Sequence, residues 1–190
     1  MSHPLDTFIP RPDICERHST LVHAPAGIVF QVARTFDLQS VAVIRGIIWL
    51  RQRLLRSQLV QRQPQPFLDE ALAMGWGRLQ GESDRLFVAG AICQPWLADV
   101  VFRPLPPSSF ATYSEPGHVK IAWTLEVEPV TESSARLSTE TRAVATDAAA
   151  RVRFRRYWRW ARFGILPIRW FLLPAIRRQA ESASRAQRAM

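Results

Sequence analysis

The sequence predicts an α+β domain in which a curved, seven-stranded antiparallel sheet is wrapped around a long C-terminal helix. Two observations carry this prediction. Residues 76–146 form short segments of mixed apolar and polar side chains separated by turn-forming residues, which is typical of successive antiparallel strands. Residues 136–160 then pass from a threonine-rich strand pattern into a helical pattern within two residues. The expected order of the main elements is one strand, two helices, six strands and one long helix.

The first third of the chain supplies the opening strand and the two helices. Residues 1–15 are rich in proline and are expected to form an extended arm. Residues 16–22 predict a strand, and Pro25, at a first helical position, opens a helix that ends before Asp37. A second helix is expected over residues 38–55, where apolar side chains share one face and arginines the other.

A change of period marks the start of the sheet. A short helix over residues 67–75 is closed by Gly75, and from Trp76 onward the pattern has a period of two. The six strands predicted in this part of the chain cover residues 76–81, 85–93, 99–103, 109–113, 118–128 and 136–146. Apolar and polar side chains alternate cleanly over residues 119–128, which predicts one covered face and one face in water.

The last helix is long and aromatic. Thr146 or Asp147 is a suitable N-cap. One apolar stripe repeats at helical spacing, and its members are Phe154, Trp158, Ala161 and Ile165. Because such a stripe has to be buried, the helix is expected to lie across an apolar surface. Gly164 and Pro167 predict a kink or a break there, followed by a second helical segment.

The composition favours a single domain. The 190 residues, with a mass of 21.7 kDa, are expected to fold as one unit over residues 16–183, with residues 184–190 fraying. The net charge of +9 comes almost entirely from arginine, because Lys120 is the only lysine. Since a GC-rich genome produces part of this bias, nucleic acid is not the expected partner.

Several kinds of site and location have no support in the sequence. Cys15 and Cys93 lack paired spacing, and His18 and His23 add no ligand pattern, so neither a disulfide framework nor a metal site is expected. No G-x-S-x-G, P-loop or G-x-G-x-x-G motif occurs, and no cofactor is expected. Without a signal peptide or an apolar run of about 20 residues, a cytoplasmic location is expected, with peripheral contact at the inner face of the membrane as the alternative.

Three phrases resemble a known superfamily. They are VHAPAGIVFQVARTFD at 22–37, EPGHVKIAWTLEVEP at 115–129 and LSTETRAVATDAAARVRFRRYW at 137–158. Together with the order of elements, they resemble the SRPBCC superfamily, the helix-grip fold of START lipid-transfer domains, birch-allergen-like proteins and polyketide cyclases. The similarity spans roughly residues 16–182, and the phrases look like a bacterial branch usually described only as SRPBCC proteins. It implies a helix-grip fold, but no activity, because this superfamily shares no catalytic motif.

The curvature of such a sheet predicts a pocket. A strongly twisted sheet curls, and one helix across its concave face does not fill the hollow. The residues expected to contact a ligand there are Trp76, Trp96, Phe102, Trp123, Thr139, Thr141, Phe154, Tyr157 and Trp158. The alternative is that the rings among them pack against one another as ordinary core. A small hydrophobic molecule is the expected partner.

Polar residues of the last strand leave two alternatives open. Glu140 and Arg142 share one face of this strand, and Thr139 and Thr141 share the other. If the first pair faces the hollow, it would hold a polar ligand head; if it faces outward, it is a surface pair worth little. His118, at the start of a strand, is a general base or a solvated turn residue.

The arginine-rich helix suggests a second kind of partner. Its cationic turns and its tryptophans suit an anionic membrane interface, and the expected contact residues are Arg155, Arg156, Arg159 and Trp170. The same side chains would also suit the phosphate backbone of a nucleic acid. In the remaining alternative the arginines form an ordinary solvated face, and the N-terminal arm or a second subunit covers the apolar side chains. The oligomeric state is left open.

The function expected from these patterns is binding or carriage of a small hydrophobic or amphipathic molecule, such as a lipid, a quinone or a polyketide-like compound. Two alternatives accompany it: a polyketide cyclase or dehydratase that uses the same cavity, and a peripheral membrane protein that docks through its basic C-terminal helix. No acid–base pair of fixed geometry supports the enzyme.

Overall fold

The structure, a computed structural model, describes residues 3–37, 40, 41, 46, 66–81 and 83–188, with the backbone alone over 164–169. Apart from residues 40, 41 and 46, the helix expected over 38–55 lies outside the described residues. The described part is an α+β fold with an antiparallel sheet and a long C-terminal helix.

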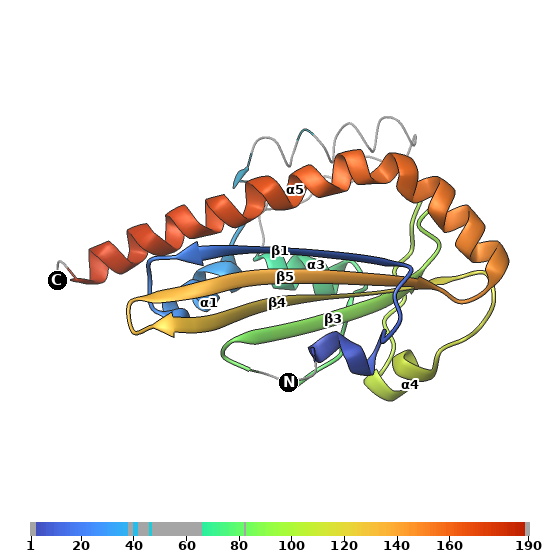
Figure 1. Cartoon of the computed structure of the whole chain (residues 1–190), viewed down its shortest axis with the longest axis horizontal. Coiled ribbons are helices and arrows are strands. Elements are labelled where there is room, and N and C mark those ends of the chain that lie inside the picture. Colours follow the sequence, from blue (N-terminus) through green and yellow to red (C-terminus); the bar gives the residue numbers. More distant parts are fainter. Residues whose placement is uncertain (1–2, 38–39, 42–45, 47–65, 82, 189–190) are drawn as a thin grey trace.

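Five strands make up the sheet of the described residues, in the order β1-β5-β4-β3-β2 (Figure 1). They are β1 (Ile14–Val22), β2 (Gly77–Arg78), β3 (Leu86–Cys93), β4 (Val119–Thr131) and β5 (Ser134–Ala145). Every pairing is antiparallel, and β1 returns from the start of the chain to pair with β5 over its whole length. The long β4–β5 hairpin therefore forms the centre of the sheet.

Two of the seven predicted strands are wrong. Within residues 99–103, only Arg103 pairs with the sheet, through an isolated bridge to Ile92. Residues 109–113 fall mostly in a short helix, α4 (Pro107–Thr112). The proline run explains the second difference, because proline at a first helical position starts a helix.

The closing helix, α5 (Ala148–Arg188), has 41 residues and arches along the sheet without interruption (Figure 1). Asp147 caps it, because its Oδ1 atom accepts a hydrogen bond from the backbone N–H of Ala150 at 2.9 Å. Of the kink or break predicted at Gly164 and Pro167, the break is wrong, because α5 continues through both residues. Buried side chains hold the helix to the protein on both sides of Pro167, and this packing outweighs the hydrogen bond that proline removes.

The two ends of the chain also differ from the sequence-based expectation. The arm expected to be extended over residues 1–15 contains a 3₁₀ helix, η1 (Pro4–Thr7), before β1 begins. At the other end α5 is still helical at residues 184–188, where fraying was expected, and the side chain of Ser184 is buried.

Both faces of the sheet are covered. The concave face packs against α5, α1 (Ala26–Thr35) and α3 (Phe67–Ala73), in a core that includes Val29, Leu137 and Ile176. The opposite face, which was expected to be in water, packs against η1 and α4 in a second core around Leu5, Ile9 and Phe110 (Figure 1). The expectation of a wet face is therefore wrong, because the N-terminal arm folds back over it.

A buried ionic cluster joins the N-terminal arm to the sheet. The Arg142 guanidinium donates through Nε to Glu140 Oε1 at 2.7 Å, and through Nη1 to Asp6 Oδ1 at 2.7 Å and to the carbonyl of Ile9 at 3.0 Å. On the other side of Glu140, His3 Nε2 lies 3.2 Å from Oε2. The hydrogen bond from Arg142, assisted by the backbone N–H of His3, lowers the pKa of Asp6 below its ordinary value. Glu140 and Arg142 are thus a buried pair on the face away from the concave hollow.

Candidate ligand cavity

A cavity of about 290 Å³ lies between the concave face of the sheet and α5. A volume of this size is at the lower end of the range found for small-molecule sites. Its walls come from β1, β4 and β5, from α3 and α5, and from the loop before α4. The lining residues are Ile14, Glu16, Phe67, Ala71, Met74, Trp76, Pro95, Val100, Phe102, Ile121, Trp123, Leu125, Thr139, Thr141, Ala143, Phe154, Tyr157, Trp158, Leu172 and Leu173.

Trp76 and Trp123 anchor an aromatic wall of the cavity. The Trp76 ring stacks on Phe102 with centroids 4.8 Å apart and meets Trp123 edge-on at 6.0 Å. Trp123 also contacts Phe67 at 5.3 Å. Gly75 makes the first of these contacts possible: it has a positive φ of 97°, and a side chain there would overlap the carbonyl of Phe102. The rings are therefore held in fixed positions by one another and by the backbone.

The opposite wall is one face of α5. Phe154 is buried and lies 6.2 Å from Trp158, centroid to centroid, one helical turn further on. Tyr157 is half-buried beside them, and Leu172 and Leu173 line the cavity from beyond the middle of the helix. A helix returns to the same face every three to four residues, so the continuity of α5 brings these two groups onto one wall.

Polar side chains collect along the β1–β5 side. Thr139 and Thr141 line the cavity from β5, and their partners across β1 are His18 and Glu16, respectively. Directly paired residues of adjacent strands point to the same face, so the four side chains form one polar row. Within this row, His18 Nε2 lies 4.0 Å from Glu16 Oε2. The cavity is thus aromatic at one side and polar at the other.

Most residues predicted to contact a ligand line this one cavity. The exception is Trp96, which packs against the cluster of Val119, Ala143 and Phe154 without lining the cavity. The question left open for β5 also has an answer: Thr139 and Thr141 face the hollow, whereas Glu140 and Arg142 face away from it. Neither of the two alternatives for that pair holds, because it is neither at the cavity nor on the surface.

Among the described residues, Glu16 is the one charged residue that lines the cavity, and it was not among the predicted ligand contacts. The strand was recognised, but its acidic first residue was not assigned to the inner face. A signal was available, because a period of two places Glu16 with Ile14 and Val22, which are apolar. A carboxylate in register with apolar side chains on an edge strand is a candidate polar group of a site.

The remaining candidates lie elsewhere. His118 sits at the turn before β4, where its Nδ1 atom is 3.0 Å from the carbonyl of Pro116, and it does not line the cavity. Cys93 is buried in β3. In the part of the chain that the structure describes, no three His, Cys, Asp or Glu side chains are grouped so as to hold a metal ion.

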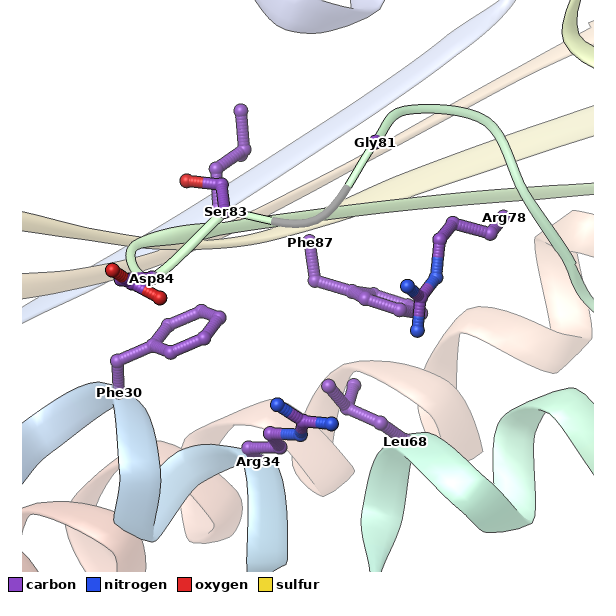
Figure 2. Close-up of a pocket in the computed structure, with 9 residues that line it drawn as sticks. Phe30, Arg34, Leu68, Arg78, Gly81, Ser83, Asp84 and Phe87 are labelled. Carbon is purple, nitrogen blue, oxygen red and sulfur yellow. The ribbon is translucent and has the colours of Figure 1, made fainter.

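A second, smaller hollow of about 60 Å³ lies between α1, α3 and the β2–β3 hairpin (Figure 2). Figure 2 shows Arg34 and Arg78 pointing into it, with Phe30, Phe87 and Leu68 around them. Arg78 also lies over the Phe87 ring at 5.5 Å from its centroid. A hollow of this size holds no more than a few water molecules, so it is not a candidate for a hydrophobic ligand.

Comparison with known proteins shows limited similarity. No family model matches the chain, and no curated protein matches it. The Zhui aromatase/cyclase from Streptomyces sp. R1128 is 14% identical, with 88% of this chain and 93% of that chain covered and a TM-score of 0.32. A hypothetical protein from Helicobacter pylori is 7% identical, with coverages of 97% and 95% and a TM-score of 0.37.

A third solved structure, the di-domain ARO/CYC BexL from the BE-7585A biosynthetic pathway, is 16% identical, with 84% of this chain and 46% of that chain covered and a TM-score of 0.27. Two of these three proteins are thus described as aromatase/cyclases. TM-scores in this range do not establish a common fold. Membership of the SRPBCC superfamily stays an expectation, and the function has to be argued from the cavity itself.

Proposed function

We propose that this protein binds a small hydrophobic or amphipathic molecule, such as a lipid, a quinone or a polyketide-like compound, between its sheet and α5. The observation that supports the proposal is the apolar cavity of about 290 Å³. Apolar ligand surface that moves from water into this space contributes about 25 cal/mol per Å² of area buried.

The distribution of side chains suggests an orientation for the ligand. The apolar body lies against Trp76, Trp123 and the inner face of α5. A hydroxyl, carbonyl or amine of the ligand lies toward Thr139 and Thr141 on the β5 side, because these are among the few polar side chains within reach. Few polar contacts mean that shape and apolarity select the ligand, so a range of related molecules should bind.

Two measurements test this function. Native mass spectrometry after mild purification should detect a bound small molecule. Titration of the delipidated protein with the neutral probe N-phenyl-1-naphthylamine should give saturable fluorescence at one site, with oleate or a short-chain quinone as competitor. If no small molecule co-purifies, and no probe binds saturably, the protein is not a carrier of such molecules.

One observation favours an enzyme of the cyclase or dehydratase type as the second candidate. The Glu16 carboxylate lines the cavity and lies beside the His18 imidazole. In a dehydration, Glu16 would accept a proton from the carbon next to a substrate carbonyl and pass that proton to the hydroxyl on the following carbon, which leaves as water while the carbon–carbon double bond forms.

Glu16→Gln separates the two functions because it keeps the shape of the side chain and removes the base. A β-hydroxyketone probe, whose dehydration to the conjugated enone raises the ultraviolet absorbance, should be turned over by the unmodified protein and about 10²-fold to 10⁴-fold more slowly by the variant. Equal rates for the two proteins, or no turnover by either, would leave binding alone as the function.

A further inference from the structure

α5 carries apolar side chains on two opposite faces. Successive residues of a helix are about 100° apart around its axis. The inner face holds Phe154, Trp158, Leu172 and Ile176, which are buried or line the cavity. Trp160, Phe163, Trp170 and Phe171 fall within about 100° of one another on the other side of the helix. Their exposed fractions are 72%, 66%, 62% and 45%.

Cationic side chains share this outer face. Arg153, Arg156 and Arg159 fall on it within the first three turns of α5, and all three are exposed. Arg162 lies beside it, with its guanidinium 5.0 Å from the centroid of the Phe163 ring. From Ala148 to Ala180 the helix has no acidic residue, so nothing within this stretch of the helix neutralises the arginines.

The exposed rings on the outer face of α5 are typical of a contact surface. Soluble proteins rarely expose several large aromatic rings in one contiguous stripe, and stripes that they do expose are usually contact surfaces. Tryptophan and phenylalanine side by side with arginine fit the boundary between lipid headgroups and acyl chains. The net charge of +9 adds attraction to an anionic surface.

We propose that the outer face of α5, defined by Trp160, Phe163, Trp170 and Phe171 with the arginines on and beside it, docks on an anionic lipid bilayer. The part of α5 between residues 160 and 171 lies in the plane of the interface, because the exposed rings follow one another along the helix axis there. The rings enter the boundary region, and the guanidinium groups contact lipid phosphates. Among the described residues, no helix is long and apolar enough to cross a bilayer. This docking does not depend on the cavity holding a ligand.

Vesicle flotation tests the proposal with the full chain. The unmodified protein should float with vesicles of phosphatidylcholine and phosphatidylglycerol, should bind pure phosphatidylcholine vesicles much more weakly, and should lose affinity as salt rises. Arg156→Ser with Arg159→Ser should weaken binding about 25-fold, at about fivefold for each arginine. Trp160→Ser with Phe163→Ser should lower binding to the anionic vesicles to the level that the unmodified protein shows with pure phosphatidylcholine vesicles.

A matched control replaces two exposed arginines at the end of the sheet, Arg85→Ser with Arg136→Ser, which changes the net charge equally. It should float nearly as well as the unmodified protein. If it loses binding as strongly as the helix variant, the attraction is that of the net charge and the docking face is refuted.

Thermal unfolding distinguishes a bilayer from a protein partner. Because the two rings are exposed, the Trp160 and Phe163 variant should keep its Tm and its capacity to bind N-phenyl-1-naphthylamine. A marked fall in Tm would mean that another part of this chain or a second copy covers the face, which overturns the proposal. A second outcome would also overturn the proposal: the unmodified protein binds duplex DNA, and the arginine variant loses DNA binding but keeps vesicle binding.

Discussion

Ala143→Leu tests whether the cavity is a true hollow, because it should stabilise the protein while weakening ligand binding. Ala143 points into the cavity from β5, and its partners on the neighbouring strands, Ile14 and Ile121, line the cavity too. The substitution adds three carbon atoms. Burying them contributes about 2.4 kcal/mol at about 0.8 kcal/mol each, and fixing the side chain costs about 0.5–1 kcal/mol.

The expected net gain is therefore about 1.5 kcal/mol, or a rise in Tm of about 3–6 °C for a chain of this length. The matched control is Ala122→Leu on the neighbouring strand. Ala122 is 0% exposed and packs in the second core, on the other side of the sheet. Overpacking there should cost about 1–3 kcal/mol.

The assay combines calorimetry with a titration of N-phenyl-1-naphthylamine. Ala143→Leu should raise the Tm and weaken probe binding, whereas Ala122→Leu should lower the Tm and leave the affinity of the remaining folded protein unchanged. If both variants are destabilised to a similar degree, the space beside Ala143 is already filled, and the reasoning about the cavity is refuted.

Two further predictions concern the packing of the arm and the cap of the last helix. Arg142→Met should lower the free energy of unfolding in urea by about 3–5 kcal/mol, because Glu140 would stay buried without its main counter-charge. Adding Glu140→Leu should restore most of this loss. A loss below about 1 kcal/mol would mean that water already solvates the cluster. Hydrogen bonds from the backbone N–H groups of Gly117 and Ala150 lower the pKa of Asp147 below its ordinary value of 3.8. Its stabilising effect is therefore complete above that pH and is lost as the pH falls through the lower pKa of the folded state. The difference in unfolding free energy between the unmodified protein and Asp147→Ala should shrink below about pH 4, and a constant difference down to pH 2 would contradict this.

The central hairpin could be predicted because its signal is local and strong. Apolar and polar side chains alternate over residues 119–128 for long enough that no helical pattern competes. The junction between strand and helix is predicted by Asp147, a suitable N-cap, and the alanines that follow it. The proline-rich part before residue 114 could not be assigned in the same way. There, Phe110 and Tyr113 look like strand residues, but Pro106 and Pro107 decide the backbone.

Other errors have a tertiary cause. The break expected at Pro167 does not occur, because contacts on either side of it hold the helix together. The aromatic wall was predictable from large side chains on the concave face, whereas Trp96 lies in a loop whose path no strand period fixes. The period of two places Glu16 on the same face as Ile14 and Val22, but that this face lines the cavity follows only from the pairing of β1 with β5.

The ionic cluster beneath the N-terminal arm has a practical consequence for anyone handling this protein. His3 and Asp6 lie ahead of β1, yet they are direct partners of the buried pair: Asp6 Oδ1 lies 2.7 Å from Arg142 Nη1, and His3 Nε2 lies 3.2 Å from Glu140 Oε2. Shortened versions that start at β1 would lose Leu5 and Ile9 from the second core and both His3 and Asp6 from the ionic cluster, so they are expected to be less stable.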